Sequence, residues 1–268
     1  MKKPKISIIM SAYNEGATIH YAIESIQAQT FSCWELIVVD DGSIDETRSI
    51  IKSYVDSDSR IKLIENVSNI GLPLSLNKAI KHSKANLIAR ADADDINIIN
   101  RLEVQYSYMI KNQDVDVLGT GAWLLGKDGK RIDNPVLLED FKRGNRASVI
   151  KPFFFHPSVM IRKSFFKKVG VYDGVYLLAE DLELWIRGSN MGCVYENIAL
   201  PLIEYRTGGY VKSWKSIFIR TKTLAKIVKK HNVINGYLSV LTLLLHSALI
   251  KLNLYKPKSL KNNSGQCK

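Results

Sequence analysis

The sequence predicts an α/β fold with a mostly parallel central sheet and helices on both of its faces. Short apolar runs alternate with segments of helical periodicity over the first hundred residues, and this alternation is typical of parallel strands joined by helices. Polar clusters follow three of the apolar runs, around Asn14, Asp41 and Asp94, at the carboxyl ends where parallel sheets bind ligands. With 268 residues, 46% of them hydrophobic, the chain can form one large domain or two small ones.

The first elements follow from local patterns. Residues 6–10 form a short apolar run that predicts a strand, and a helix with one apolar face comes next. Residues 35–43 predict a buried second strand that ends in turn residues. Ser43 and Glu46, three positions apart, predict a capping box at the start of the following helix. The apolar face of the first helix contains Ile19, Ala22, Ile23 and Ile26.

The same alternation continues for two more strands. Residues 60–66 predict the third strand, residues 72–83 the helix after it, and residues 86–92 the fourth strand. Because the helical and extended segments keep alternating, the first half of the chain predicts a Rossmann-like arrangement.

Beyond residue 100 the pattern changes. Asn100 and Glu103 predict a capped helix that ends near Lys111. Residues 115–132 predict two strands around a Lys-Asp-Gly-Lys turn. Residues 178–192 predict a helix, with one face formed by Leu182, Trp185 and Ile186.

The positive charge is concentrated in the last quarter of the chain. The net charge is +12, but from Tyr205 onward there are thirteen basic residues and no acidic one, which leaves 25 basic against 26 acidic residues in 1–204. A charge confined to a tail does not indicate a nucleic-acid-binding domain. The sequence therefore predicts no nucleic-acid partner.

The basic tail predicts association with a membrane surface. Residues 213–231 have lysines on one side and apolar residues at helical spacing on the other, a pattern typical of an interfacial helix. Residues 233–250 are more apolar, but polar residues interrupt them, so they fall short of a membrane span. The alternative is that both helices dock on the main domain. The apolar side consists of Trp214, Ile217, Phe218, Thr221, Leu224 and Val228.

The start of the chain and the cysteines point to a cytosolic-facing protein. The apolar run 6–10 is too short for the core of a signal peptide. The three cysteines are an odd number without paired spacing, which suits a reducing compartment and argues against a disulfide framework or a zinc site.

Three carboxylates follow the fourth strand within four positions: Asp92, Asp94 and Asp95. Anions this close repel one another unless a positive charge lies between them. An Asp-x-Asp pair at a sheet edge suits a hard divalent cation shared with phosphate oxygens. For Asp95 alone, a role as a turn former or helix cap is an equal alternative.

A calcium loop does not fit this segment. Asp92, Asp94 and Glu103 fall at loop positions one, three and twelve, but Ile96 and Asn97 stand where a ligand and a glycine are required. The first strand also leads into Ser-Ala-Tyr-Asn-Glu-Gly and not into a glycine-rich phosphate loop. A bound nucleoside diphosphate would therefore need a metal for its charge.

Five segments taken together resemble successive motifs of the inverting family 2 glycosyltransferases, which have the GT-A fold. The resemblance is greatest to bacterial members that extend O-antigen or capsule repeat units, and it covers residues 5 to about 206 in the order of the family's motifs. The segments are residues 7–47, 69–80, 88–105, 155–163 and 179–188.

The resemblance implies a role for each matching position. Asp94, with Asp92, is implied to hold Mn²⁺ or Mg²⁺ against the diphosphate, and Asp181 is implied to be the catalytic base. As an alternative, Glu180 and Asp181 are an ordinary acidic first turn of a helix. The implied contacts of the donor nucleotide are Ser11, Ala12, Tyr13, Glu15, Asp41, Asp92 and Ala93.

A further group of matching positions is implied to lie near the acceptor or the diphosphate. His156 is one of them, with a structural role beside Pro157 as the alternative. The histidine that usually follows the Tyr-Arg pair is missing, because residues 205–214 contain none. The group consists of Arg90, Asp95, His156, Glu180 and Arg206.

The resemblance implies an inverting, metal-dependent enzyme that moves a hexose or N-acetylhexosamine from a UDP-sugar to a polyprenyl-diphosphate-linked saccharide. It implies a catalytic domain over 1–209, with a donor half 1–95 and an acceptor half 96–209. The basic, amphipathic pattern of the tail predicts a membrane-associating region over 210–268. The expected location is peripheral, on the cytoplasmic face of the bacterial inner membrane. Two other classes stay open: a sugar-phosphate nucleotidyltransferase and an inactive sugar-nucleotide-binding scaffold.

Overall fold

The computed structural model describes residues 3–126, 128–132, 134–138, 154–176, 178–207 and 214–231, the side chains of 214–218 excepted. One sheet of eight strands runs through this part of the chain in the order β3-β2-β1-β4-β7-β6-β8-β5. The strands are β1 Ile6–Ala12, β2 Trp34–Asp40, β3 Ile61–Glu65, β4 Leu87–Arg90, β5 Ile96–Asn97, β6 Val117–Leu125, β7 Met160–Arg162 and β8 Tyr195–Arg206.

The sheet is parallel in its first half and mixed in its second. β1 pairs in parallel with both β2 and β4, and β2 pairs in parallel with β3. β7 is antiparallel to β4 and β6, β6 is parallel to β8, and β5 is antiparallel to β8. The predicted parallel sheet is therefore confirmed for the four strands with alternating helices, and the curled, mixed part comes from the segment where the sequence pattern changes.

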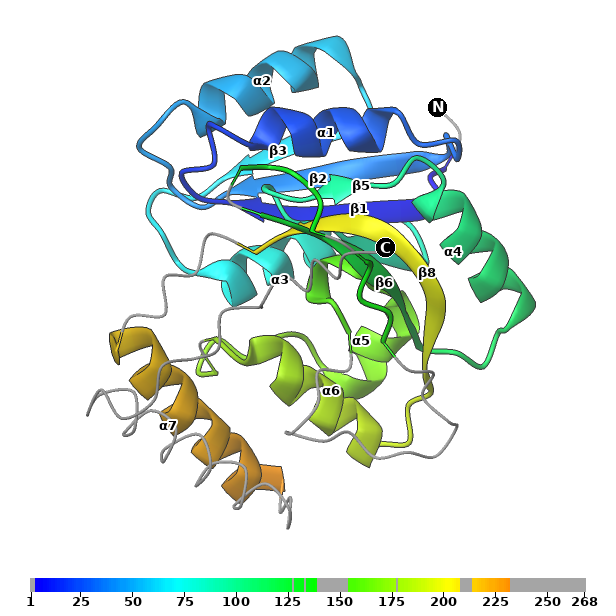
Figure 1. Cartoon of the computed structure of the whole chain (residues 1–268), viewed down its shortest axis with the longest axis vertical. Coiled ribbons are helices and arrows are strands. Elements are labelled where there is room, and N and C mark those ends of the chain that lie inside the picture. Colours follow the sequence, from blue (N-terminus) through cyan, green and yellow to red (C-terminus); the bar gives the residue numbers. More distant parts are fainter. Residues whose placement is uncertain are drawn as a thin grey trace, which may run out of the picture.

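Helices cover both faces of the sheet (Figure 1). Alternate residues of a strand point to opposite faces, so Ile8 packs in the cluster under α1 and α2, whereas Ile9 packs in the cluster with α3, α5 and α6. The helices are α1 Ile19–Gln27, α2 Thr47–Ser57, α3 Leu72–His82, α4 Arg101–Lys111, α5 Lys163–Val169, α6 Glu180–Asn190 and α7 Trp214–His231, with a 3-10 turn, η1, at His156–Ser158.

The predicted capping box of α2 is wrong. The helix begins at Thr47 after Glu46, and no side-chain hydrogen bond caps it. The carboxylate of Asp45 accepts hydrogen bonds from the backbone N–H (3.0 Å) and the hydroxyl (2.6 Å) of Thr47. The hydroxyl of Ser43 instead accepts the backbone N–H of Asn14 at 3.1 Å. Ser43 is thus used to fix the loop after β1, which lies at the ligand-binding edge of the sheet.

Two other local predictions are only partly right. α4 has the predicted bounds, but the carboxylate of Glu103 accepts the hydroxyl of Thr30 at 2.6 Å, and no side-chain hydrogen bond caps the helix. After β6 the chain does turn back, with a hydrogen bond from the Ile132 N–H to the Leu124 carbonyl at 2.7 Å. In the described residues this return forms isolated bridges to β6 and no second strand.

The apolar side of α7 is covered between Thr221 and Val228. Leu224 and Ile227 belong to the same core cluster as Trp185 on α6, and Val228 is buried. Over these residues the side predicted to face a bilayer lies in the protein interior. The side chains of Trp214, Ile217 and Phe218, and residues 233–250, lie outside the described residues.

Within the described residues, no helix is both long and apolar enough to span a membrane. The basic side of α7 is exposed, at Arg220, Lys222, Lys226 and Lys229 among others.

Candidate active site

The loop after β1 is fixed against the start of α2. The backbone N–H of Glu15 donates to the Thr47 hydroxyl at 2.7 Å, and that of Gly16 donates to Asp45 at 3.0 Å. Asn14 takes a positive φ of 57°, a conformation that asparagine tolerates better than most residues. Tyr13, in this loop, is 43% exposed. Ser11 and Ala12, which precede it, are the last two residues of β1.

Asp41 is a buried anchor for the segment that starts α3. Its carboxylate accepts hydrogen bonds from the Asn66 amide (2.8 Å) and from the backbone N–H groups of Ile70 and Gly71 (both 2.9 Å). Gly71 has a φ of 90°, which favours glycine. Asp41 therefore shapes the loop beside the predicted nucleotide site, and its contact with a uracil stays a prediction.

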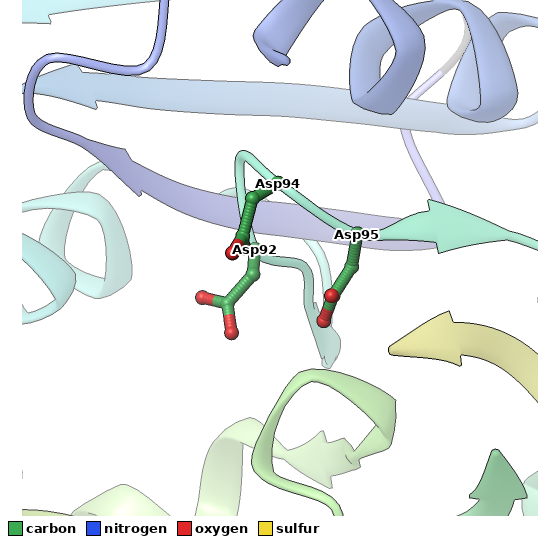
Figure 2. Close-up of side chains that lie close together, drawn as sticks. All are labelled: Asp92, Asp94 and Asp95. Carbon is green, nitrogen blue, oxygen red and sulfur yellow. The ribbon is translucent and has the colours of Figure 1, made fainter. Parts of the chain in front are cut away.

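Asp92, Asp94 and Asp95 come together at the end of β4, as the sequence predicts. Each offers a carboxylate oxygen that lies within 4.8 Å of the others, and Figure 2 shows the three side chains extending from the same loop. Ala93 between them is buried in the core.

The electrostatics of this cluster favour a cation. Burial, reinforced by the charges of Asp92 and Glu15, raises the pKa of Asp94 to about 6. Burial and the charges of Asp92 and Asp94 raise the pKa of Asp95 well above its usual value. One oxygen of Asp95, Oδ2, is buried without a hydrogen-bond partner in the structure. This donor set of hard carboxylate oxygens, one of them unsatisfied, fits Mn²⁺ or Mg²⁺.

Two buried arginines lie beneath the aspartates. Both terminal nitrogens of Arg90, which is 2% exposed, donate to the carboxylate of Asp92. Arg101, on α4, donates to the backbone carbonyl of Arg90 at 2.8 Å and to the side chains of Asn97 and Gln105. Burial and the charge of Arg90 lower the pKa of Arg101 to about 9. The sequence prediction missed Arg101, since nothing in its local pattern marks it as buried.

The end of β8 closes over the aspartate loop. The backbone N–H of Arg206 donates to Asp95 at 2.8 Å, and its guanidinium Nε donates to the carbonyl of Asp94 at 3.1 Å. The structure therefore brings Arg206, at the end of β8, to the carboxylate cluster at the end of β4. Its contact with an acceptor or a diphosphate stays a prediction.

Glu180 and Asp181 lie in the first turn of α6. Burial and the charge of Asp181 raise the pKa of Glu180 to about 7, and burial also raises the pKa of Asp181. The backbone N–H of Leu182 donates to Asp181 at 2.7 Å. Carboxylates with raised pKa values in a buried site are suited to proton transfer near neutral pH.

His156 contacts a residue that the sequence prediction missed. Its Nε2 lies 2.8 Å from the hydroxyl of Tyr172, and the side chain of Asn77 holds Tyr172 by its backbone N–H and carbonyl. Burial and the charge of Arg90 lower the pKa of His156 well below its usual value, so the imidazole is neutral. Burial raises the pKa of Tyr172, with Arg90 opposing and Asp181 and Glu180 adding to the shift. The phenol of Tyr172 is thus close enough to Glu180 and Asp181 for their charges to affect its pKa.

The chain belongs to glycosyl transferase family 2, whose family pattern matches residues 7–170. It is 34% identical over 208 residues to the O-antigen biosynthesis glycosyltransferase WbnJ of Escherichia coli, covering 75% of this chain and 79% of that protein. It is 32% identical over 213 residues to an Escherichia coli UDP-Gal:alpha-D-GlcNAc-diphosphoundecaprenol beta-1,3-galactosyltransferase, covering 76% and 74%. These findings support a glycosyltransferase enzyme over both alternative classes.

Solved structures show the same GT-A fold. Staphylococcus aureus TarS 1–349 in complex with UDP has a TM-score of 0.65 at 19% identity, over 84% of this chain and 65% of that one. The mannosyltransferase PcManGT of Pyrobaculum calidifontis, in complex with GDP-Man and Mn²⁺, has a TM-score of 0.65 at 15% identity, over 96% and 77%. The predicted GT-A fold is confirmed.

Proposed function

We propose that this glycosyltransferase transfers a hexose or N-acetylhexosamine from a UDP-sugar to a saccharide on a polyprenyl diphosphate, with inversion to a β-linkage. The observation that carries the proposal is the cluster of Asp92, Asp94 and Asp95 at the end of β4, together with the acidic pair Glu180 and Asp181 in the first turn of α6. Besides burial, the charge of Asp92 contributes to the raised pKa of Glu180. The named substrates of the galactosyltransferase relative, a UDP-sugar and a lipid-diphosphate acceptor, are consistent with this chemistry.

Asp94 and Asp92 would hold Mn²⁺ or Mg²⁺ in the donor site. When bound, the cation offsets the negative charge that develops on the departing UDP. Arg90 keeps Asp92 in place through its two hydrogen bonds. The loop Ser11–Glu15 and the segment anchored by Asp41 form the nucleoside side of this site.

Asp181 is the proposed general base. Its carboxylate accepts the proton of the acceptor hydroxyl while that oxygen attacks the anomeric carbon, and the bond from this carbon to UDP breaks on the opposite face. A single displacement of this kind turns an α-linked donor into a β-linked product. Glu180, His156 and Arg206 line the side on which the acceptor and diphosphate are expected.

The proposed pathway is assembly of O-antigen or a related surface polysaccharide, with the protein peripheral on the cytoplasmic face of the bacterial inner membrane. The exposed lysines of α7, such as Lys222 and Lys226, are suited to anionic headgroups. A lipid-linked acceptor would require the enzyme to work at this surface.

A donor-by-acceptor assay tests the proposed function. The full chain is incubated with labelled UDP-sugars and a synthetic lipid-diphosphate GlcNAc or GalNAc acceptor, with Mn²⁺, with Mg²⁺ and with a chelator. We expect metal-dependent glycosylation of the lipid and a β-linkage in the product. Transfer that is unchanged by the chelator would contradict the metal assignment, and an α-linkage would contradict inversion.

A further inference from the structure

A fully buried carboxylate follows the proposed base by two residues. The side chain of Glu183 has no exposed surface and lies in the first turn of α6, with Glu180 and Asp181. Three cationic or basic groups surround it: Arg187 NH2 at 2.8 Å, Lys230 Nζ at 3.1 Å and His231 Nε2 at 3.0 Å. Two of the three come from the end of α7, more than forty residues further along the chain.

The same end of α7 reaches the segment before α6. Lys230 Nζ lies 3.9 Å from a carboxylate oxygen of Asp173 and 4.9 Å from the ring centre of Tyr176. From α6, Arg187 donates to the carbonyl of Val171 at 2.9 Å. One cluster of charges therefore joins α7, α6 and the segment that carries Tyr172.

Apolar packing places α7 against α6 over the preceding turns. Leu224 and Ile227 share a core cluster with Leu184 and Trp185 of α6, and Figure 1 shows the two helices side by side on one flank of the molecule. Only the Glu183 carboxylate in this cluster is fully buried, whereas Lys230 is 45% exposed. Since burying a charge is costly unless it is well paired, Glu183 gives α7 a role that a helix held only by a lipid surface would not have.

The charges of α7 also act on the acidic turn. Burial alone would raise the pKa of Glu183, but hydrogen bonds from Arg187, Lys230 and His231 outweigh it and lower the pKa. Glu183 is therefore ionised and neutralised by its partners, so its charge adds little repulsion to the neighbouring Glu180 and Asp181.

We propose that α7 is a positioning arm of the active site, in which Lys230 and His231 hold Glu183 and thereby fix the first turn of α6 that presents Asp181 to the acceptor. Lys230, His231 and Glu183 touch no reacting atom and are positioning residues. The inference rests on the proposed role of Asp181 as the base. The proposal makes α7 part of the catalytic domain in its function as well as in its packing.

The test compares Lys230→Ala with the conservative Lys230→Arg and with Lys229→Ala, an exposed neighbour on the same helix. All are full-length chains, assayed with a detergent-soluble acceptor so that vesicle binding does not matter. We expect Lys230→Ala to lower kcat about tenfold or more, since small displacements of catalytic groups have effects of this size. UDP affinity should stay within about twofold, because Lys230 contacts Glu183, Asp173 and Tyr176, none of which is a proposed donor-site residue. Lys230→Arg should recover most of the rate, and Lys229→Ala should equal the parent chain.

Further variants distinguish a positioning role of Lys230 and His231 from a loss of folding. They also test separately whether Asp181 is the base. His231→Asn and the thermal unfolding of every variant are measured in parallel, so the proposal stays testable if Lys230→Ala does not fold. The proposal is overturned if folded Lys230→Ala and His231→Asn both keep the parent kcat. It is also overturned if the rate loss disappears at a temperature where both variants are fully folded. Asp181→Asn in the same assay tests the base: normal turnover there would overturn the proposed function instead.

Discussion

At the scale of single residues, Asp94 is the side chain on which donor binding should depend most. Asp94 is half-buried, and its raised pKa of about 6 reflects this burial and the charges of Asp92 and Glu15. No glycine-rich loop is present to bind phosphates in its place. Arg90 offsets part of the repulsion among these like charges, and a bound cation or an added proton would offset more of it.

We therefore predict that Asp94→Ala abolishes Mn²⁺-dependent UDP binding in calorimetry, whereas Asp56→Ala, an exposed acidic residue on α2, has no effect. In the parent chain, protons compete with the metal for a carboxylate whose pKa is about 6. Mn²⁺ affinity should be constant above this pH and fall by about tenfold per pH unit below it. Parent-like affinity in Asp94→Ala, or affinity that does not change between pH 7.5 and pH 5, would contradict the metal site.

The acidic pair on α6 gives a second residue-scale prediction. Asp181→Asn keeps the size of the side chain and removes the base, so kcat should fall by about 10²–10⁴-fold, with UDP affinity nearly unchanged. The measurement is steady-state turnover with saturating UDP-sugar, alongside calorimetry with UDP. If Asp181→Asn turns over normally and Glu180→Gln does not, the base is Glu180, whose pKa of about 7, raised by burial and by Asp181, would also suit it.

The site could be predicted from the sequence only where a motif marks it. Asp92 and Asp94 stand in a short acidic motif at a strand end, which local sequence is enough to find. Asp181 is predicted only by the resemblance to the family's motifs, because an acidic first turn is common in helices. Tyr172 and Arg101 could not be found in this way. Arg101 is buried because Arg90, Asn97 and Gln105 surround it in space, and Tyr172 reaches His156 because Asn77, on another element, holds its backbone.

At the scale of elements, α6 fits its surroundings closely. A Cβ atom added at Gly188 would lie 2.2 Å from the Tyr195 hydroxyl on β8 and 2.7 Å from the ring of Phe165 on α5. Because both neighbours are buried in the core, the helix would have to shift. Asp181 lies in the first turn of the same helix, so its position depends on this close approach.

We predict that Gly188→Ala lowers the free energy of unfolding by about 1–3 kcal/mol, the usual cost of overpacking a core, and lowers kcat more than it changes UDP affinity. Asn190→Ala, an exposed position at the end of the same helix, is the control and should change neither. Urea unfolding and turnover provide the two measurements. A Gly188→Ala variant as stable as the Asn190→Ala variant would mean that the helix tolerates the shift without cost.

Elements with their own periodicity could be predicted, and those defined by their neighbours could not. β1, β2, β4 and α6 have runs that identify them locally. The antiparallel position of β7 between β4 and β6 depends on pairings between distant segments, which no local pattern encodes. α7 shows the limit most clearly, because one amphipathic pattern suits both a bilayer and a protein core, and Leu224 and Ile227 lie in the core.

At the scale of the whole molecule, the charge is divided between a near-neutral body and a basic C-terminal region. Since the apolar side of α7 is covered from Thr221 to Val228, a membrane would meet the described part of this helix mainly through its cations. Deleting the region from residue 210 would also remove Leu224 and Ile227 from the core. Charge variants are therefore the cleaner test of membrane binding.

We predict that Lys222→Gln combined with Lys226→Gln weakens binding to anionic vesicles while UDP affinity and thermal stability stay unchanged. Both side chains are exposed, and each lysine near an anionic surface contributes about 1 kcal/mol, so a loss of more than tenfold in partitioning is expected. Raising the salt should release the parent chain as well, because exposed charges are screened within about 10 Å at 0.1 M salt and about 3 Å at 1 M. Flotation with anionic and neutral liposomes at low and high salt measures both effects. Binding that survives high salt and the double variant would place the membrane contact on apolar side chains elsewhere in the chain.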